Sequence, residues 1–286
     1  MKATIQKIVV IITLFIGSIS YVNAQNKTEN ALLWEVSGNG LAKPSYLFGT
    51  IHMICEKDFV MKPKVNDAFA KTSQLVLEIN MADPNELVAM QQLALGKEPL
   101  SKQLTKEQLA KLEEILKREV GVGVAQVDQF SLQTILSLVS MKSFGCDNIK
   151  MYEMEFVAKA KQINKPVLGL EKVKEQFDYM AKALDSNEII EQLSKSDKQL
   201  TQQLVATYLN EDVSGLYEFS TNKEMMSATA VQWMLQFRNE NWLKTMPTLM
   251  QKESTFFAVG AAHLGGEIGI IHLLRKAGYT VKPIMG

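Results

Sequence analysis

The chain has 286 residues, of which 47% are hydrophobic, and it is long enough to bury a large core as one domain or as two closely joined parts. Its 31 basic and 31 acidic side chains cancel, and setting Lys2 and Lys7 aside with the N-terminal segment leaves 29 basic against 31 acidic. This balance argues against the strongly basic surface that a nucleic-acid partner requires, so we expect no such partner.

The N-terminal segment 1–24 is typical of an export signal. Lys2 and Lys7 precede the apolar run Ile8–Ile16, and Val22-Asn23-Ala24 supplies small residues at the expected cleavage spacing. We therefore expect cleavage after Ala24 and a mature protein that is periplasmic or secreted. The apolar run is short for a membrane span, so we expect no stable membrane insertion after cleavage; an uncleaved N-terminal anchor is the alternative.

A β-hairpin is predicted at the start of the mature chain. Leu32–Val36 and Ser45–Phe48 are short apolar runs, and the Gly and Asn residues between them are typical of a turn. The second run continues into Gly49-Thr50-Ile51-His52. The hairpin therefore delivers a histidine just beyond the end of a strand.

The chain contains two cysteines, Cys55 and Cys146. In an exported protein such a pair can form a disulfide, which would tie the loop after His52 to the region after Phe130–Met141. Two buried free thiols are the alternative. Neither cysteine has a partner at ligand spacing, so we do not expect a cysteine-ligated zinc site.

The middle of the chain is predicted to be mainly helical. The predicted strand Leu75–Asn80 is interrupted near its end by Glu78, where a carboxylate is costly to bury without a partner. A second strand, Lys165–Glu171, also ends in a carboxylate, and Thr105 with Gln108 forms a capping box that starts a helix. Further helices are expected over Val65–Thr72, Phe130–Met141, Tyr152–Ile163, Lys174–Leu184, Asn187–Leu209 and Met225–Leu249.

The C-terminal part again places a histidine after a strand. Thr255–Gly260 predicts the strand, and Gly260-Ala261-Ala262-His263 is a second Gly-x-x-His segment. A helix over Glu267–Ala277 and a strand over Tyr279–Ile284 follow. Because strands occur at both ends, we expect a mixed α/β fold of the α+β type. Its N- and C-terminal parts form a central sheet with a large helical insertion between them, as one domain over 25–286.

Three side chains are candidates for one shared site at an edge of this sheet. His52, Glu78 and His263 each lie at or just after the end of an apolar strand. Two imidazoles and a carboxylate are a plausible divalent-metal site. Hydrogen-bonded structural histidines are the alternative, because a Gly-x-x-His segment is weak evidence by itself.

Two helical residues complete the set of candidates. Arg238 lies one helical turn before Trp242 and is suited to steady a substrate carboxylate or an oxyanion; a solvated or salt-bridged helix arginine is the alternative. His272 is expected to be a helix residue at the core edge or surface. The sequence contains no Gly-x-Ser-x-Gly elbow, no phosphate-binding Gly-x-x-x-x-Gly-Lys loop and no His-Glu-x-x-His helix.

Five short motifs occur in order along nearly all of the mature chain. They are Gly49-Thr50-Ile51-His52-Met53, Leu77-Glu78, Leu168-Gly169-Leu170-Glu171 with Gln176, Arg238-Asn239 with Trp242, and Gly260-Ala261-Ala262-His263-Leu264. This ordered set resembles the TraB/GumN family, a group that includes Tiki-like proteins.

The resemblance implies a metal-dependent peptidase-like fold in which His52, His263 and Glu78 hold a divalent ion. Manganese or cobalt is implied more than zinc, with a peptide or protein as substrate. Glu78 would complete the metal shell or take a proton from the attacking water, and Arg238 would stabilise developing negative charge. Two other functions stay open: a non-catalytic haem- or metal-binding protein outside the cytoplasm, and an esterase-like hydrolase that needs no metal.

Overall fold

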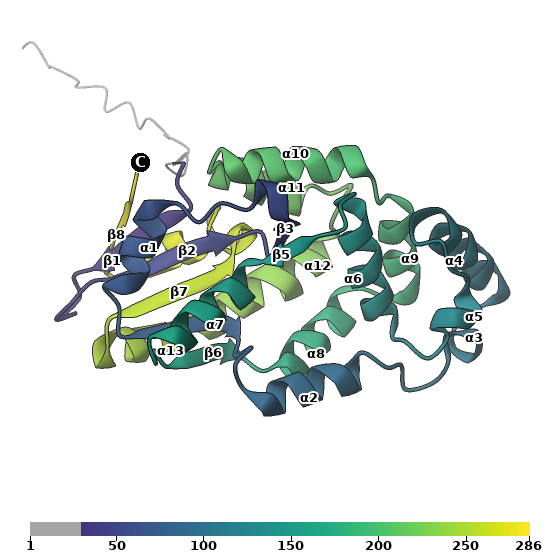
Figure 1. The fold of residues 1–286 in the computed structure, drawn as a ribbon, viewed down its shortest axis with the longest axis horizontal. Coiled ribbons are helices and arrows are strands. Elements are labelled where there is room, and N and C mark those ends of the chain that lie inside the picture. The colour runs from purple at the N-terminus through teal and green to yellow at the C-terminus, as the bar shows by residue number, and fades with distance from the viewer. Residues whose placement is uncertain (1–29) are drawn as a thin grey trace, which may run out of the picture.

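A computed structural model describes residues 30–286, and the expected signal peptide over 1–24 lies outside the described residues. The fold is mixed α/β, as predicted, with the sheet on one side of the molecule and most helices on the other (Figure 1). Within the described part of the chain, no helix is both long and apolar enough to cross a bilayer.

A six-stranded sheet contains both ends of the described chain, in the strand order β6-β4-β7-β2-β1-β8. The N- and C-terminal parts therefore build the sheet together, as predicted. The strands are β1 (Leu33–Ser37), β2 (Ser45–Thr50), β4 (Gln74–Ile79), β6 (Val167–Glu171), β7 (Thr255–Gly260) and β8 (Thr280–Pro283).

Strand direction divides this sheet into two parts. The predicted hairpin is confirmed, because β1 and β2 pair antiparallel, and β8 pairs antiparallel with β1. The neighbouring strands β6, β4, β7 and β2 run parallel to one another. β2, β4 and β7 are buried along their whole length, which explains their nearly continuous apolar sequences. Because the four strands are parallel, their carboxyl ends meet at one edge of the sheet.

Helices fill most of the chain between β4 and β7, as predicted, and several of them enclose a second apolar core. That core includes Leu112, Ile115, Ile135 and Ile190 from three different helices. The helices are α1 (Pro63–Ala70), α2 (Pro84–Leu93), α3 (Leu100–Gln103), α4 (Lys106–Glu119), α5 (Val124–Val127), α6 (Leu132–Ser143), α7 (Tyr152–Gln162), α8 (Val173–Ala183), α9 (Ser186–Ser194), α10 (Lys198–Leu209), α11 (Val213–Thr221), α12 (Ala228–Val231), α13 (Phe237–Lys252) and α14 (Ile270–Lys276).

Three of the predicted helices need correction. The single helix predicted over Asn187–Leu209 is wrong, because α9 and α10 are separate. Asp197 begins α10 by accepting a hydrogen bond from the Gln199 backbone N–H, and aspartate at this position favours a helix start over helix continuation. The helix predicted over Glu267–Ala277 begins only at Ile270, after a turn.

The long helix predicted over Met225–Leu249 is also interrupted. It starts at α12, where the Ser227 hydroxyl accepts a hydrogen bond from the backbone as an N-cap. The segment η2 (Gln232–Gln236) is a π-helix, and α13 then continues through Pro247. Single π-turns are rare and occur often at functional sites. This one lies directly before the candidate Arg238.

A two-stranded ribbon lies outside the main sheet. It pairs β3 (Met53–Cys55) antiparallel with β5 (Ile149–Met151), two strands that are too short to show periodicity in the sequence. Cys55 and Cys146 form a disulfide across a separation of 91 residues, so the predicted disulfide is confirmed and the alternative of free thiols is wrong. The ribbon joins the segment after β2 to the segment before α7.

Candidate active site

The carboxyl ends of the four parallel strands bring charged side chains to one edge of the sheet. His52 follows β2, His263 follows β7 through the short turn η3 (Ala261–His263), and Glu78 and Glu171 lie near the ends of β4 and β6. Glu78 Oε1 lies 3.7 Å from Nε2 of His52 and 3.9 Å from Nε2 of His263. The structure thus brings together three residues that the sequence placed at strand ends, and this edge is where open parallel sheets bind ligands.

A glycine in each Gly-x-x-His segment makes this convergence possible. A Cβ atom at Gly260 would lie 2.8 Å from His52 Nε2 and 3.3 Å from Glu78 Oε1. A Cβ atom at Gly49 would lie 2.8 Å from the Leu264 side chain. In addition, the Gly260 N–H donates a hydrogen bond of 2.7 Å to Glu78 Oε1. Any larger residue at Gly260 would therefore fill the space where the two side chains meet.

His52 occupies the open side of the site, with its side chain 49% exposed. Its backbone has a φ of +58°, and its carbonyl accepts a hydrogen bond from Tyr152 N–H at 3.1 Å. Its Nδ1 lies 2.8 Å from Glu153 Oε1, which also accepts a 2.7 Å hydrogen bond from the Thr50 hydroxyl. Burial lowers the pKa of His52, but the carboxylates of Glu153 and Glu78 outweigh it and raise that pKa to about 9.

His263 occupies the closed side, where its side chain is only 4% exposed. The Asn239 amide donates to the carbonyls of His263 and Ile268, which turns its Oδ1 toward His263 Nδ1 at 2.6 Å. Nδ1 therefore carries the proton, and Nε2 accepts a 3.0 Å hydrogen bond from Arg238 Nη1. Burial first and Arg238 next lower the pKa of His263 to about 3, so this imidazole is neutral.

Arg238 links the buried carboxylates of the site. Its Nη2 donates to Glu78 Oε2 at 2.5 Å and to Glu171 Oε1 at 2.6 Å, and its Nη1 also donates to the Met234 carbonyl of η2. The guanidinium carbon lies 4.8 Å from the centre of the Trp242 ring, and the residue is 4% exposed. Arg238 is thus a buried, salt-bridged arginine, which agrees with the salt-bridged form of the alternative and excludes the solvated form.

The ionisation of Glu78 follows from these neighbours. Burial raises the pKa of Glu78, but Arg238 first and the two histidines next outweigh it and hold that pKa well below its usual range. Burial also raises the pKa of Glu171, which Arg238 opposes. Both carboxylates accept further hydrogen bonds from the Gln176 amide, at 3.2 Å and 3.0 Å. These donors hold Glu78 in its ionised form, whereas for Glu171 burial outweighs them and the pKa stays above its ordinary value.

Some residues of the network had little or no signal in the sequence. Glu171, Gln176 and Asn239 belong to the five motifs but carried no predicted role, and the structure puts each in direct contact with a candidate residue. Glu153 was missed, because no motif lies beside it and the three-residue strand β5 before it shows no periodicity in the sequence. His272 is exposed on α14 and lies outside the network.

His52, Glu78 and His263 have the ligand chemistry that suits a divalent ion, but Nε2 of His263 already accepts a hydrogen bond. Two ligands about 2.0–2.2 Å from a shared ion lie about 3–4 Å apart, as Glu78 Oε1 does from both Nε2 atoms. Over residues 30–286, however, no cluster of three His, Cys, Asp or Glu side chains is arranged to hold a metal ion. Because Arg238 donates to His263 Nε2, three-ligand binding requires that guanidinium to leave this nitrogen.

Comparison with known proteins gives one family and two curated relatives. A model of the TraB/PrgY/gumN family matches residues 32–283. The chain is 23% identical over 322 residues to the Danio rerio protein named metalloprotease TIKI2, covering 90% of this chain and 61% of that protein. It is 22% identical over 322 residues to metalloprotease TIKI1 of the same organism, covering 91% and 64%. The chain therefore spans less than two thirds of the length of these relatives, and no solved structure matches it.

Proposed function

This chain belongs to the TraB/PrgY/gumN family, and we propose that it is an exported metal-dependent peptidase in which His52, Glu78 and His263 hold a divalent ion. The names of its two distant relatives support a protease that acts on peptides or proteins. Manganese or cobalt is proposed over zinc on the family resemblance, and a shell of imidazole and carboxylate ligands is compatible with these ions.

The observation that carries the proposal is the charge balance of the buried edge. In the ion-free structure the imidazolium of His52 and the guanidinium of Arg238 face the carboxylates of Glu78, Glu153 and Glu171, which leaves a net charge of −1. A histidine must be neutral to bind an ion, so the net charge becomes −2 when His52 loses its proton. Uncompensated buried charge is costly, and a divalent cation is the ligand that neutralises it.

The residues of the chain would divide the work of hydrolysis. A bound ion would polarise the scissile carbonyl and lower the pKa of a bound water. The substrate would approach on the side of His52, because His263, Glu78 and Arg238 are buried. The low pKa of Glu78 makes it a weak base, so it is better suited to bind the ion than to accept a proton while Arg238 remains on it. Once released from His263 and Glu78, Arg238 would stabilise negative charge on the substrate oxygen.

A cleavage screen with matched variants tests this function. The purified protein is stripped with a chelator and then assayed on a peptide library with manganese, cobalt or zinc added back. We expect cleavage only with added ion, loss of activity and of ion binding in His52→Ala and His263→Ala, and no effect of His272→Ala. If both site variants keep their metal affinity and turnover, the proposed site is wrong. A ligand retained through purification, with no turnover under any condition, would instead indicate a binding protein.

One observation favours a second candidate function, a hydrolase that works without metal. Glu153 lies against His52 Nδ1, and a carboxylate beside an imidazole is the arrangement that orients a histidine general base. In this alternative Arg238 would keep its bond to His263 throughout. Activity on ester or amide substrates that survives complete removal of metal would support it over the metal-dependent peptidase.

Export remains part of the proposal. The Cys55–Cys146 disulfide supports an oxidising compartment, where such bonds persist. We expect the protein recovered outside the cytoplasm to begin at Gln25, and N-terminal sequencing of that material tests the cleavage position. Recovery only in the cytoplasm, with its full leader, would contradict export.

A further inference from the structure

Glu153 is a buried carboxylate whose contacts have no explanation in the sequence motifs. Glu153 is 7% exposed, and its Oε1 accepts hydrogen bonds from both the Thr50 hydroxyl and the His52 ring. Its Oε2 is the one buried side-chain nitrogen or oxygen atom that lacks a hydrogen-bond partner among residues 30–286. Burying a carboxylate with an unsatisfied oxygen costs stability, so this residue is a poor choice for packing alone.

The β3–β5 ribbon is the element that brings Glu153 to His52 across 101 residues. His52 directly precedes β3, and Glu153 comes two residues after the end of β5. Met53 pairs with Met151, and the next backbone bond of the ladder joins Tyr152 N–H to the His52 carbonyl. The disulfide at the other end of the ribbon prevents the two strands from separating. The register places Tyr152 opposite His52, and Glu153, the next residue, contacts the His52 ring from the first turn of α7.

We propose that Glu153 is a positioning residue, which holds the proton of His52 on Nδ1 and so directs the Nε2 lone pair toward Glu78. A carboxylate accepts hydrogen bonds but donates none, so the ring nitrogen facing it must carry the hydrogen. The other nitrogen, which lies 3.7 Å from Glu78 Oε1, is then free to bind a ligand or a proton at the centre of the site. Thr50 limits the choice of ring orientation by fixing the same carboxylate oxygen from its other side.

A purely structural role makes different predictions from this one. An acidic residue in the first turn of a helix also interacts favourably with the helix dipole, and Glu155 in the same turn of α7 does so while its carboxylate pairs with the partly exposed Lys150. Glu155→Gln is therefore a matched control for Glu153→Gln. Both changes remove one charge from the same turn, but only one of them touches His52.

The first measurement is the tautomer of His52 in metal-free protein. The chain has three histidines, so ¹⁵N-labelled imidazoles give few signals, and His52→Gln identifies the one of interest. In chelator, at a pH high enough to make the imidazole neutral, we expect the wild type to show hydrogen on Nδ1. Glu153→Gln should give a mixture of tautomers, and Glu155→Gln should match the wild type. A wild-type Nδ1 without hydrogen, or an unchanged tautomer in Glu153→Gln, would overturn the assignment.

The second measurement is ion affinity, and its interpretation rests on the proposed metal site. Titration with manganese should show binding weakened about 10- to 100-fold in Glu153→Gln and unchanged in Glu155→Gln. If the wild type binds no ion while its tautomer depends on Glu153, the metal proposal fails and the positioning role stands. If Glu153→Gln does not fold, Thr50→Val replaces it, with a smaller shift of the tautomer expected; no shift in folded Thr50→Val protein would then count against the proposal.

Discussion

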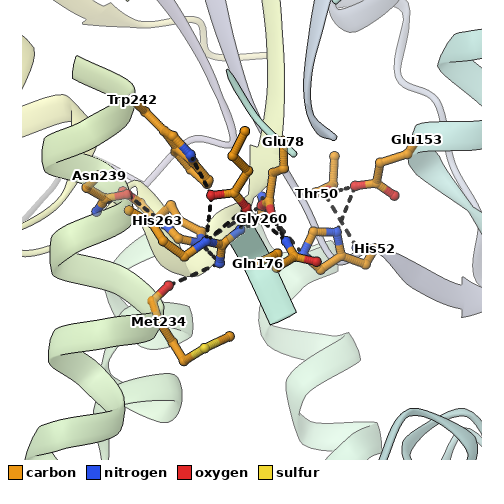
Figure 2. Close-up of polar contacts among 12 residues, drawn as sticks. Thr50, His52, Glu78, Glu153, Gln176, Met234, Asn239, Trp242, Gly260 and His263 are labelled. Atoms are coloured by element: carbon orange, nitrogen blue, oxygen red, sulfur yellow. Dashed lines mark hydrogen bonds and ion pairs between the residues drawn. The ribbon is translucent and has the colours of Figure 1, made fainter. Parts of the chain in front are cut away.

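The two Gly-x-x-His segments share a sequence pattern but hold their histidines in opposite environments. His52 is half exposed and faces the carboxylate of Glu153, which with Glu78 raises its pKa to about 9. His263 is buried, faces the amide of Asn239, and has a pKa lowered to about 3. In Figure 2, Glu153 and Asn239 lie at opposite ends of the network, with Glu78 between the histidines.

The difference shows that the charge of each histidine depends on its partner and not on its motif. A carboxylate stabilises an imidazolium, whereas a neutral amide and a nearby guanidinium in a buried setting do not. His52 is therefore the histidine that exchanges protons near solvent, and His263 stays a neutral acceptor. The ring of His263 is further enclosed by Trp242, whose centroid lies 4.4 Å away.

Loss of Arg238, on the closed side of the site, is expected to have the largest effect on stability. Arg238→Ala leaves Glu78 and Glu171 buried without their cation, and breaking a buried ion pair costs about 3–5 kcal/mol in the free energy of unfolding. Urea denaturation at neutral pH measures this loss, with His272→Ala as the control on an exposed helix position. Equal stability of the two variants would contradict a stabilising role for the network.

Removal of the disulfide is expected to affect the open side selectively. The double variant Cys55→Ser/Cys146→Ser frees a loop of 91 residues and should lose about 2–4 kcal/mol of unfolding free energy. Hydrogen exchange should then rise in β3 and β5 beside His52 and stay low in β7 before His263. An equal rise of hydrogen exchange in all of these strands would show that the disulfide does not stabilise the ribbon selectively.

Asn239→Ala is expected to disturb only the closed side, with a smaller loss of stability. It leaves His263 Nδ1–H and two backbone carbonyls without their partner, which costs about 1–3 kcal/mol. Thermal and urea unfolding measure the change. Asn241→Ala on the exposed surface of the same helix is the control and should be nearly neutral. A neutral Asn239→Ala would mean that water replaces the amide at this buried position.

The smallest expected effect is a difference in pH dependence in metal-free protein. The folded pKa of His52 lies above the ordinary 6.5, so its contribution to stability is complete below pH 6.5 and is lost as the pH rises through about 9. The folded pKa of His263 lies below 6.5, so this residue costs stability as the pH falls from 6.5 toward 3. Because His52 is half exposed, screening reduces its share.

Urea midpoints across this pH range, measured in chelator, separate the two histidines. His52→Gln should flatten the profile between pH 6.5 and about 9, with a smaller change on the acid side, because His52 also lowers the pKa values of Glu78 and His263. A profile in His52→Gln that still falls on the alkaline side by the wild-type amount would show that another group titrates there.

Much of the sheet could be predicted, because the apolar pattern of each strand is visible within a few neighbouring residues. The strand predicted over Thr255–Gly260 has the same bounds as β7. The hairpin is also present, Glu78 lies near the end of β4 as predicted, and a glycine precedes each of the two histidines. The helices were harder, because one apolar periodicity ran across the break between α9 and α10, where only the capping preference of Asp197 marked the boundary.

The contact between Glu153 and His52 and the buried role of Arg238 could not be predicted from the sequence. Glu153 meets His52 only because β3 pairs with β5, two three-residue strands without a readable pattern. The choice between a surface and a buried role for Arg238 depended on whether two glutamates from distant strands would face it.

The sequence by itself determined the strands of the main sheet, which side chains end them and where glycine leaves space, since apolar pattern and backbone preference act over a few neighbouring residues. Only the tertiary structure decided which histidine is charged, which nitrogen of each ring is free, and that Arg238 stands between His263 and Glu78. The physical reason is the short distance in space over which these effects act. Burial and charge act through atoms a few ångströms away, and here those atoms come from segments far apart in the chain.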